Sequence, residues 1–139
     1  GDLNWMQETD LSEIAYIGCD IDHLATARAN ASGFNAYTVR ILEIDIISGI
    51  LPRADAILCR DFMQHLPHEL VFQTLRNFAR TGAEWLLMTS HPNEVNEDIK
   101  KPGDFRPLNL LAPPFNFPEP AMIIADPPGT SRMLGVWKT

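Results

Sequence analysis

Short apolar runs alternate with helix-like segments along the first two thirds of the chain, and polar residues follow each run. The runs occupy residues 15–21, 37–42, 54–59 and 85–89. Runs of this length and composition are typical of strands that are buried on both faces of a parallel sheet. The alternation therefore predicts an α/β fold with a doubly wound, mostly parallel sheet.

Two of the segments between the runs carry helix signals. In the first, Asp22 is a suitable cap for a helix over residues 23–31, and Gly33 is a suitable stop. The predicted apolar stripe of this helix consists of Leu24, Ala27 and Ala31. In the second, Pro67 lies near the start of a helix and Gly82 near its end. Its predicted apolar face consists of Val71, Leu75, Phe78 and Ala79.

The last third of the chain breaks this alternation. Seven prolines fall within residues 92–120, which predicts an ordered Pro-rich lid or substrate loop that packs on the domain through its apolar residues. Two later runs, 121–125 and 134–137, predict a hairpin whose turn lies at 127–129. This hairpin is expected to form an antiparallel C-terminal edge of the sheet.

Composition limits the possible partners. With 139 residues and 45% hydrophobic residues, the chain is expected to form one domain over residues 1–139. A net charge of -7 disfavours the basic surface that nucleic acids require. No apolar run approaches the roughly 18 residues of a membrane span, and the N-terminus does not look like a secretion signal. We therefore expect a cytoplasmic protein, with Cys19 and Cys59 as reduced thiols inside apolar runs.

Two acids occupy positions at which α/β proteins bind ribose and adenine. Asp20 ends an early strand, where a carboxylate accepts hydrogen bonds from two ribose hydroxyl groups. Asp45 follows the next strand, where it can meet an adenine amino group. The alternatives are a solvated acid beside the helix cap for Asp20 and an ordinary turn residue for Asp45.

Several segments together resemble the motifs of class I S-adenosylmethionine-dependent methyltransferases, which have a Rossmann-like fold. The segments that carry the resemblance are Gly1-Asp2 with Asn4-Trp5-Met6, residues 16–21, Asp45 with Leu51-Pro52, and residues 54–61. The stretch of residues 106–118 resembles the tail of a bacterial subgroup of this family. Order and spacing carry the likeness, which covers residues 1–91.

The resemblance implies S-adenosyl-L-methionine as the cofactor and assigns residues to it. Gly1 and Asp2 resemble the end of the loop that holds the methionine part of the cofactor. The ribose would lie on Asp20, with Ile21 as a further cofactor contact, and the adenine beside Asp45 and Ile46. The residues lining the cofactor after the family's fourth strand would be Arg60, Asp61 and Phe62.

The chain as given begins inside the first cofactor loop of that family. We therefore expect a fragment that lacks the first strand and leaves a gap in the sheet between the strands ending at Asp20 and Asp61. Such a fragment is expected to fold poorly or to bind cofactor weakly, and to be a poor catalyst on its own.

Histidines raise two further hypotheses. His65 follows Asp61 and is the candidate catalytic base, with a structural histidine as the alternative. The sets Asp20, Asp22, His23 and His65, His68 suggest metal ligands, but neither has a clear third partner, so no metal is predicted.

These observations favour methyl transfer from S-adenosyl-L-methionine to a small-molecule or saccharide acceptor. One alternative is an NAD-dependent oxidoreductase, which also uses an acid at the position of Asp20. The other is a cofactor-binding domain without catalysis. The sequence does not predict the oligomeric state.

Overall fold

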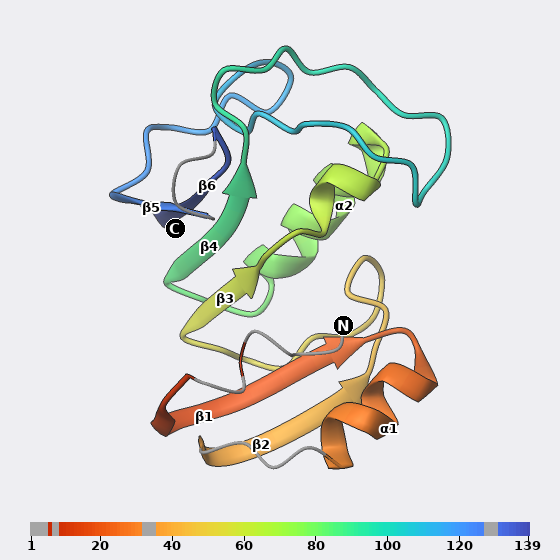
Figure 1. The fold of residues 1–139 in the computed structure, drawn as a ribbon, viewed down its shortest axis with the longest axis vertical. Coiled ribbons are helices and arrows are strands. Elements are labelled where there is room, and N and C mark those ends of the chain that lie inside the picture. Colours follow the sequence, from red (N-terminus) through yellow and green to blue (C-terminus); the bar gives the residue numbers. More distant parts are fainter. Residues whose placement is uncertain (1–5, 7–8, 32–35, 127–130) are drawn as a thin grey trace. The chain divides into compact units, whose positions relative to one another are not determined.

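A computed structural model describes Met6 and residues 9–31, 36–126 and 131–139 (Figure 1). Within it the chain forms two compact units, Gly1–Ile50 and Leu51–Thr139. The prediction of one domain over residues 1–139 stays a prediction.

The first unit consists of two parallel strands and the helix that connects them. The strands are β1 (Leu11–Asp20) and β2 (Ala36–Glu43), and the helix is α1 (His23–Ala31). The register places Gly18 opposite Ile41 and Asp20 opposite Glu43. The predicted strands and helix are confirmed, although β1 begins earlier than expected. The predicted stop at Gly33 lies outside the described residues.

Helix α1 begins as predicted but buries a different face. The Leu24 N–H donates to Oδ1 of Asp22 at 2.8 Å, which confirms Asp22 as the cap. Thr26 and Ala29 are buried, whereas Leu24 is 63% exposed. The predicted stripe through Leu24 and Ala27 is wrong, because the small residues of the helix face the sheet and leave Leu24 outside.

The second unit is a four-stranded sheet with one α-helix. Its elements are β3 (Ala56–Cys59), the short 3-10 helix η2 (Met63–His65), α2 (His68–Ala79), β4 (Trp85–Ser90), β5 (Met122–Ala125) and β6 (Met133–Lys138). The strand order is β3-β4-β6-β5, with β3 parallel to β4 and the other two pairs antiparallel. The C-terminal edge hairpin is confirmed, and its predicted turn at 127–129 lies outside the described residues.

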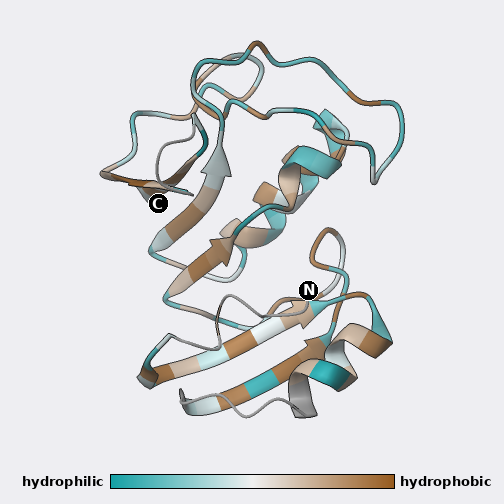
Figure 2. Ribbon diagram, in the orientation of Figure 1, coloured by the Kyte–Doolittle hydropathy of each residue, from teal (hydrophilic) through white to brown (hydrophobic). Residues whose placement is uncertain are grey.

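The apolar patterns of the second unit fit these positions. In Figure 2 the apolar colour runs through β3 and the middle of β4, whereas α2 alternates between polar and apolar residues. Val71 and Phe78 are buried on α2 as predicted, but Ala79 is exposed and Leu75 only half-buried. The buried residues that complete this core include Leu86, Met88, Leu108, Leu110 and Trp137.

The predicted doubly wound, mostly parallel sheet is wrong. The described residues contain six strands and two α-helices, and the strands form two separate sheets. Two of the strand pairings are parallel and two are antiparallel. Residues 44–55, between β2 and β3, form turns and extended chain without a helix. No described strand pairs with both β1 and β3, so the described strands form two sheets and not one.

Two asparagines hold the Pro-rich segment, residues 92–120, in a fixed course on the second unit. The Asn96 Nδ2 donates to the carbonyl groups of Asn109 and Pro113 at 2.7 and 2.8 Å. The Asn109 Nδ2 donates to the carbonyl groups of Pro92 and Glu94 at 2.8 and 3.0 Å. These bonds replace the backbone pairing that prolines cannot make, because proline has no N–H. The expectation that this segment packs is confirmed, and its role as a lid stays a prediction.

Candidate functional site

The first unit brings Asp20 and Asp45 to the same edge of its two-stranded sheet. Asp20 pairs with Glu43 in the parallel register, and the Ile44 N–H donates to the Asp20 carbonyl at 2.9 Å. Asp45 follows directly. Since parallel strands end at one edge, both carboxylates belong to the strand-end edge where α/β proteins bind ligands.

The backbone that follows Asp20 donates hydrogen bonds to its carboxylate. Its Oδ1 accepts the Asp22 N–H at 2.9 Å. Partial burial acts to raise the pKa of Asp20, whereas the hydrogen bonds that its charged form accepts from the Asp22 and Ile21 N–H groups act to lower it. An ionised carboxylate is the form that accepts hydrogen bonds from two hydroxyl groups. Ile21 beside it is 71% exposed.

The Asp45 carboxylate organises a turn. Its Oδ1 accepts the Ile47 N–H at 2.9 Å, and its Oδ2 accepts the Ser48 hydroxyl. The Gly49 N–H donates to the Asp45 carbonyl at 2.7 Å. These contacts are those of an ordinary turn aspartate, which was the alternative role for Asp45. A carboxylate still has acceptor positions for a further donor. Ile46, within the turn, is half-buried.

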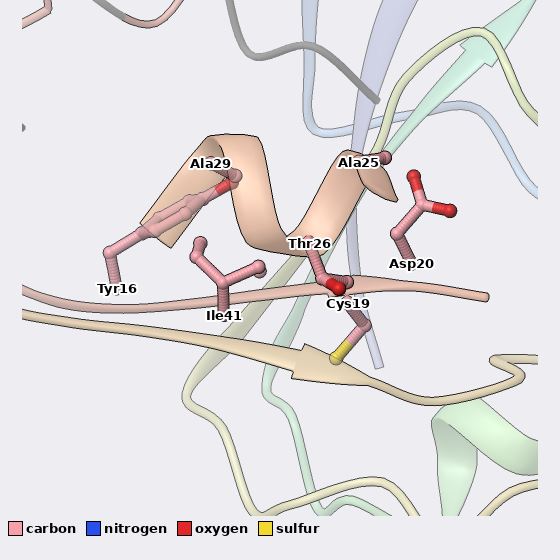
Figure 3. A pocket seen from close by; sticks show the side chains of 8 residues that line it. Tyr16, Cys19, Asp20, Ala25, Thr26, Ala29 and Ile41 are labelled. Carbon is pink, nitrogen blue, oxygen red and sulfur yellow. The ribbon is translucent and has the colours of Figure 1, made fainter. Parts of the chain in front are cut away.

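A small hollow lies between α1 and the two strands. Figure 3 shows Tyr16, Asp20 and Ile41 pointing towards α1, and the Cys19 thiol on the opposite side of β1. Gly18 keeps the hollow open, because a Cβ there would lie 2.8 Å from Cδ1 of Ile41. Burial, and after it the neighbouring Cys19, raises the pKa of Tyr16, so its phenol is neutral.

The volume of this hollow limits what can enter it. At about 40 Å³ it has room for a few water molecules. Enclosed ligand pockets measure roughly 300–1,000 Å³. A nucleoside would therefore rest against the strand-end edge at Asp20 and not inside the hollow.

The second unit has four charged residues at the end of its sheet, which we call the four-charge cluster: Arg60, Asp61, Asp126 and Arg132. The Arg60 Nε and Nη2 donate to Oδ2 and Oδ1 of Asp126 at 2.7 and 2.9 Å. The Arg132 Nη1 donates to Oδ1 of Asp61 at 2.9 Å. The hydrogen bond from Arg60 lowers the pKa of Asp126 and raises that of Arg60. The cluster ties the C-terminal hairpin to the end of β3.

Asp61 has the least ordinary backbone in this cluster. Its φ is 54°, in the left-handed region that few residues other than glycine adopt. The Asp61 N–H donates to Oγ1 of Thr89 at 2.9 Å, and the Gln64 Nε2 donates to Oδ1 of Asp61 at 3.0 Å. Strained backbone of this kind concentrates at functional sites. Phe62, which follows, is half-buried.

Known proteins add nothing to this geometry. No known protein family, curated protein or solved structure matches the chain.

The remaining predicted residues are placed as follows. Gly1 and Asp2 lie outside the described residues. The Nδ1 of His65 lies 3.2 Å from the Asp104 carbonyl oxygen, and its ring lies 5.7 Å from that of Phe105 between centroids. A donor at Nδ1 leaves Nε2 as the basic nitrogen.

Neither of the two sets considered for a metal forms a cluster of ligands. Over the described ranges, no group of three or more His, Cys, Asp or Glu side chains is arranged to hold a metal ion. His23 instead contacts Glu43, with 2.8 Å between Nδ1 and Oε2.

In the described part of the chain, neither helix is long and apolar enough to cross a membrane.

Sequence reasoning missed the partners of the predicted cofactor residues in the second unit. Asp126 lies 66 residues beyond Arg60, and Arg132 lies 71 residues beyond Asp61. Each is an isolated charge beside a short apolar run, with no motif around it. The predicted hairpin was the only signal for these partners. A hairpin that pairs with the sheet brings the charged residues beside its strands to the end of that sheet.

Proposed function

We propose that this protein transfers a methyl group from S-adenosyl-L-methionine to a small-molecule or saccharide acceptor. The observation that carries the proposal is the shared strand-end edge of Asp20 and Asp45 in a parallel strand pair. An ionised acid at that edge suits a ribose diol, and the exposed Ile21 offers an apolar surface beside it.

The proposed contacts follow the chemistry of the cofactor. Asp20 accepts hydrogen bonds from the two ribose hydroxyl groups, and Asp45 with Ile46 contacts the adenine. For Arg60, Asp61 and Phe62 of the second unit, a role towards the cofactor stays a prediction from the resemblance. Within that unit, Asp61 has the left-handed backbone that concentrates at functional sites.

The cofactor supplies an electrophilic methyl group on a sulfonium, so the protein mainly has to align the acceptor with it. Where the acceptor loses a proton, that proton goes to Nε2 of His65. The contact between His65 Nδ1 and the Asp104 carbonyl favours the tautomer that leaves Nε2 free to accept it.

With the expected first strand restored ahead of Gly1, calorimetry tests cofactor binding. S-adenosyl-L-methionine and its demethylated product should bind, and NAD should not. Asp20→Asn should raise the Kd about 10- to 100-fold, because hydrogen bonds to a charged group contribute about 1.5–3 kcal/mol each. Asp55→Asn, at an exposed acid of the second unit, is the matched control and should leave the Kd unchanged.

Transfer of a tritiated methyl group to a metabolite extract tests the reaction itself. For an acceptor that must lose a proton, His65→Gln should lower kcat about 100-fold or more while the Kd for the cofactor stays the same. Preferential binding of NAD would replace the proposal with an oxidoreductase. Cofactor binding without transfer to any acceptor would favour a non-catalytic binding domain.

A further inference from the structure

Arg106 is buried with one edge of its guanidinium unused. The residue is 5% exposed. Its Nη1 donates to the carbonyl groups of Gln64 and Met63 at 3.1 and 3.4 Å. Its Nε and Nη2 are both shielded from solvent and have no hydrogen-bond partner among the described residues. Buried donors without partners are rare in folded proteins, so we expect an acceptor from outside the chain at this edge.

The unused edge is the one that binds oxyanions. The Nε and Nη2 of an arginine form a planar fork that matches the two oxygens of a carboxylate or phosphate. Arg60 of the same unit shows this use, since its Nε and Nη2 hold both oxygens of Asp126. Among the described residues, no carboxylate lies within ion-pair distance of Arg106. The most buried arginine of the unit therefore lacks the partner that the more exposed Arg60 has.

A second shielded nitrogen belongs to His68, on which the charge of Arg106 acts. The Nε2 of His68 is buried and also has no partner among the described residues. The Nδ1 of His68 lies 3.9 Å from Oδ2 of Asp98. Burial is the main cause that lowers the pKa of His68; the charge of Arg106 lowers it further and that of Asp98 opposes both. Asp98 offsets part of the charge of Arg106, but neither Asp98 nor a single water molecule supplies two acceptors to the fork.

We propose that the Nε and Nη2 edge of Arg106, with Nε2 of His68, binds an oxyanion: a carboxylate or phosphate group carried by a small molecule. This inference is independent of the proposed methyl transfer. A bound anion supplies two acceptors for the guanidinium fork and one for a protonated His68. In surroundings shielded from water such contacts are stronger than at the surface.

The burial of these atoms has a consequence for the Pro-rich segment. Arg106 belongs to this segment, as does Asp98, whose Oδ1 accepts the His68 N–H at the start of α2 at 2.8 Å. An anion reaches the buried edge only when the surrounding chain opens. Once bound, it links the segment to the start of α2, so binding and ordering of the segment are coupled.

Titration of the full chain with inorganic phosphate and, separately, with acetate tests the site. The NMR signal of the Arg106 Nε–H should shift and saturate with at least one of the two, at constant ionic strength. The comparison between them identifies which oxyanion the site prefers. The pKa of His68 should rise at saturation. Hydrogen exchange of the Leu108 and Leu110 amides should slow about 100-fold when the anion is at 100 times its Kd.

Three variants distinguish the site from a general effect of salt. Arg106→Gln should abolish the saturable response, and Arg106→Lys should weaken it at least tenfold, because lysine keeps the charge but loses the fork. Arg80→Gln, at an exposed arginine near the end of α2, should respond like the natural chain. The natural chain alone decides the matter if Arg106→Gln does not fold.

Three results would overturn the proposal. The first is an Arg106 signal that does not saturate with either anion. The second is an equal response in a folded Arg106→Gln variant. The third is a crystal structure grown in phosphate that shows only ordered water at the Nε and Nη2 edge.

Discussion

Replacing Asn109 with alanine should loosen the Pro-rich segment, because its side chain joins both arms of that segment. The residue is 5% exposed, and its side chain makes three hydrogen bonds to the backbone. Its Nδ2 donates to the carbonyl groups of Pro92 and Glu94, and its Oδ1 accepts the Leu111 N–H at 3.0 Å. At about 1 kcal/mol for each bond, Asn109→Ala should cost about 3 kcal/mol.

Hydrogen exchange at the Leu110 amide reports this loss directly, because that amide donates to Oγ of Ser90 at 3.0 Å. A cost of about 3 kcal/mol corresponds to exchange about 100-fold faster. Asn93→Ala, at an exposed asparagine of the same segment, is the matched control and should change exchange less than threefold. Equal rates in the two variants would refute the role given to Asn109.

Three further predictions concern the second unit. Gly135→Ala should lower its free energy of unfolding by about 1–3 kcal/mol, because a Cβ there would overlap the buried Trp137 ring; a change under about 0.5 kcal/mol in urea unfolding would contradict this. Burial lowers the pKa of His68 below 6.5, so the neutral imidazole stabilises the folded state above that pH. This stabilisation is lost as the pH falls through the lowered pKa. The urea midpoint should therefore fall more steeply from pH 7 to 5 in the natural chain than in His68→Gln. Asp126→Asn should lower the free energy of unfolding by about 1–2 kcal/mol at pH 7, because Arg60 holds the pKa of Asp126 below 3.8 and stabilises the folded state above that pKa. The difference between the two proteins should vanish as the pH is lowered through the depressed pKa. Acid unfolding of both proteins checks this.

The local elements could be predicted from the sequence, but their assembly could not. The strands of the first unit and the cap at Asp22 follow from patterns within about ten residues, and the structure confirms them. A single doubly wound sheet requires a strand that pairs with both β1 and β3, and the described residues provide none. Alternating strands and helices indicate which elements form, but not whether every strand finds a neighbour.

The residues of the candidate site were easier to anticipate than their partners. Asp20 and Asp45 could be chosen because each follows an apolar run, and the register brings both to one edge. Nothing in the neighbourhood of Arg132 or Asp126 indicates that they meet the end of β3. The unused edge of Arg106 was equally out of reach, because only the packed structure shows which donors lack acceptors.

The Asn96 and Asn109 contacts also determine where the Pro-rich segment tolerates added sequence. The asparagines hold its two arms, whereas Lys100 and Lys101 between those arms are fully outside the core and exposed. Loop tips of this kind accept inserted peptides because few backbone bonds depend on them. An epitope or fluorophore tag grafted between the two lysines would therefore leave both arms in place and give a handle on the protein that neither terminus has to provide.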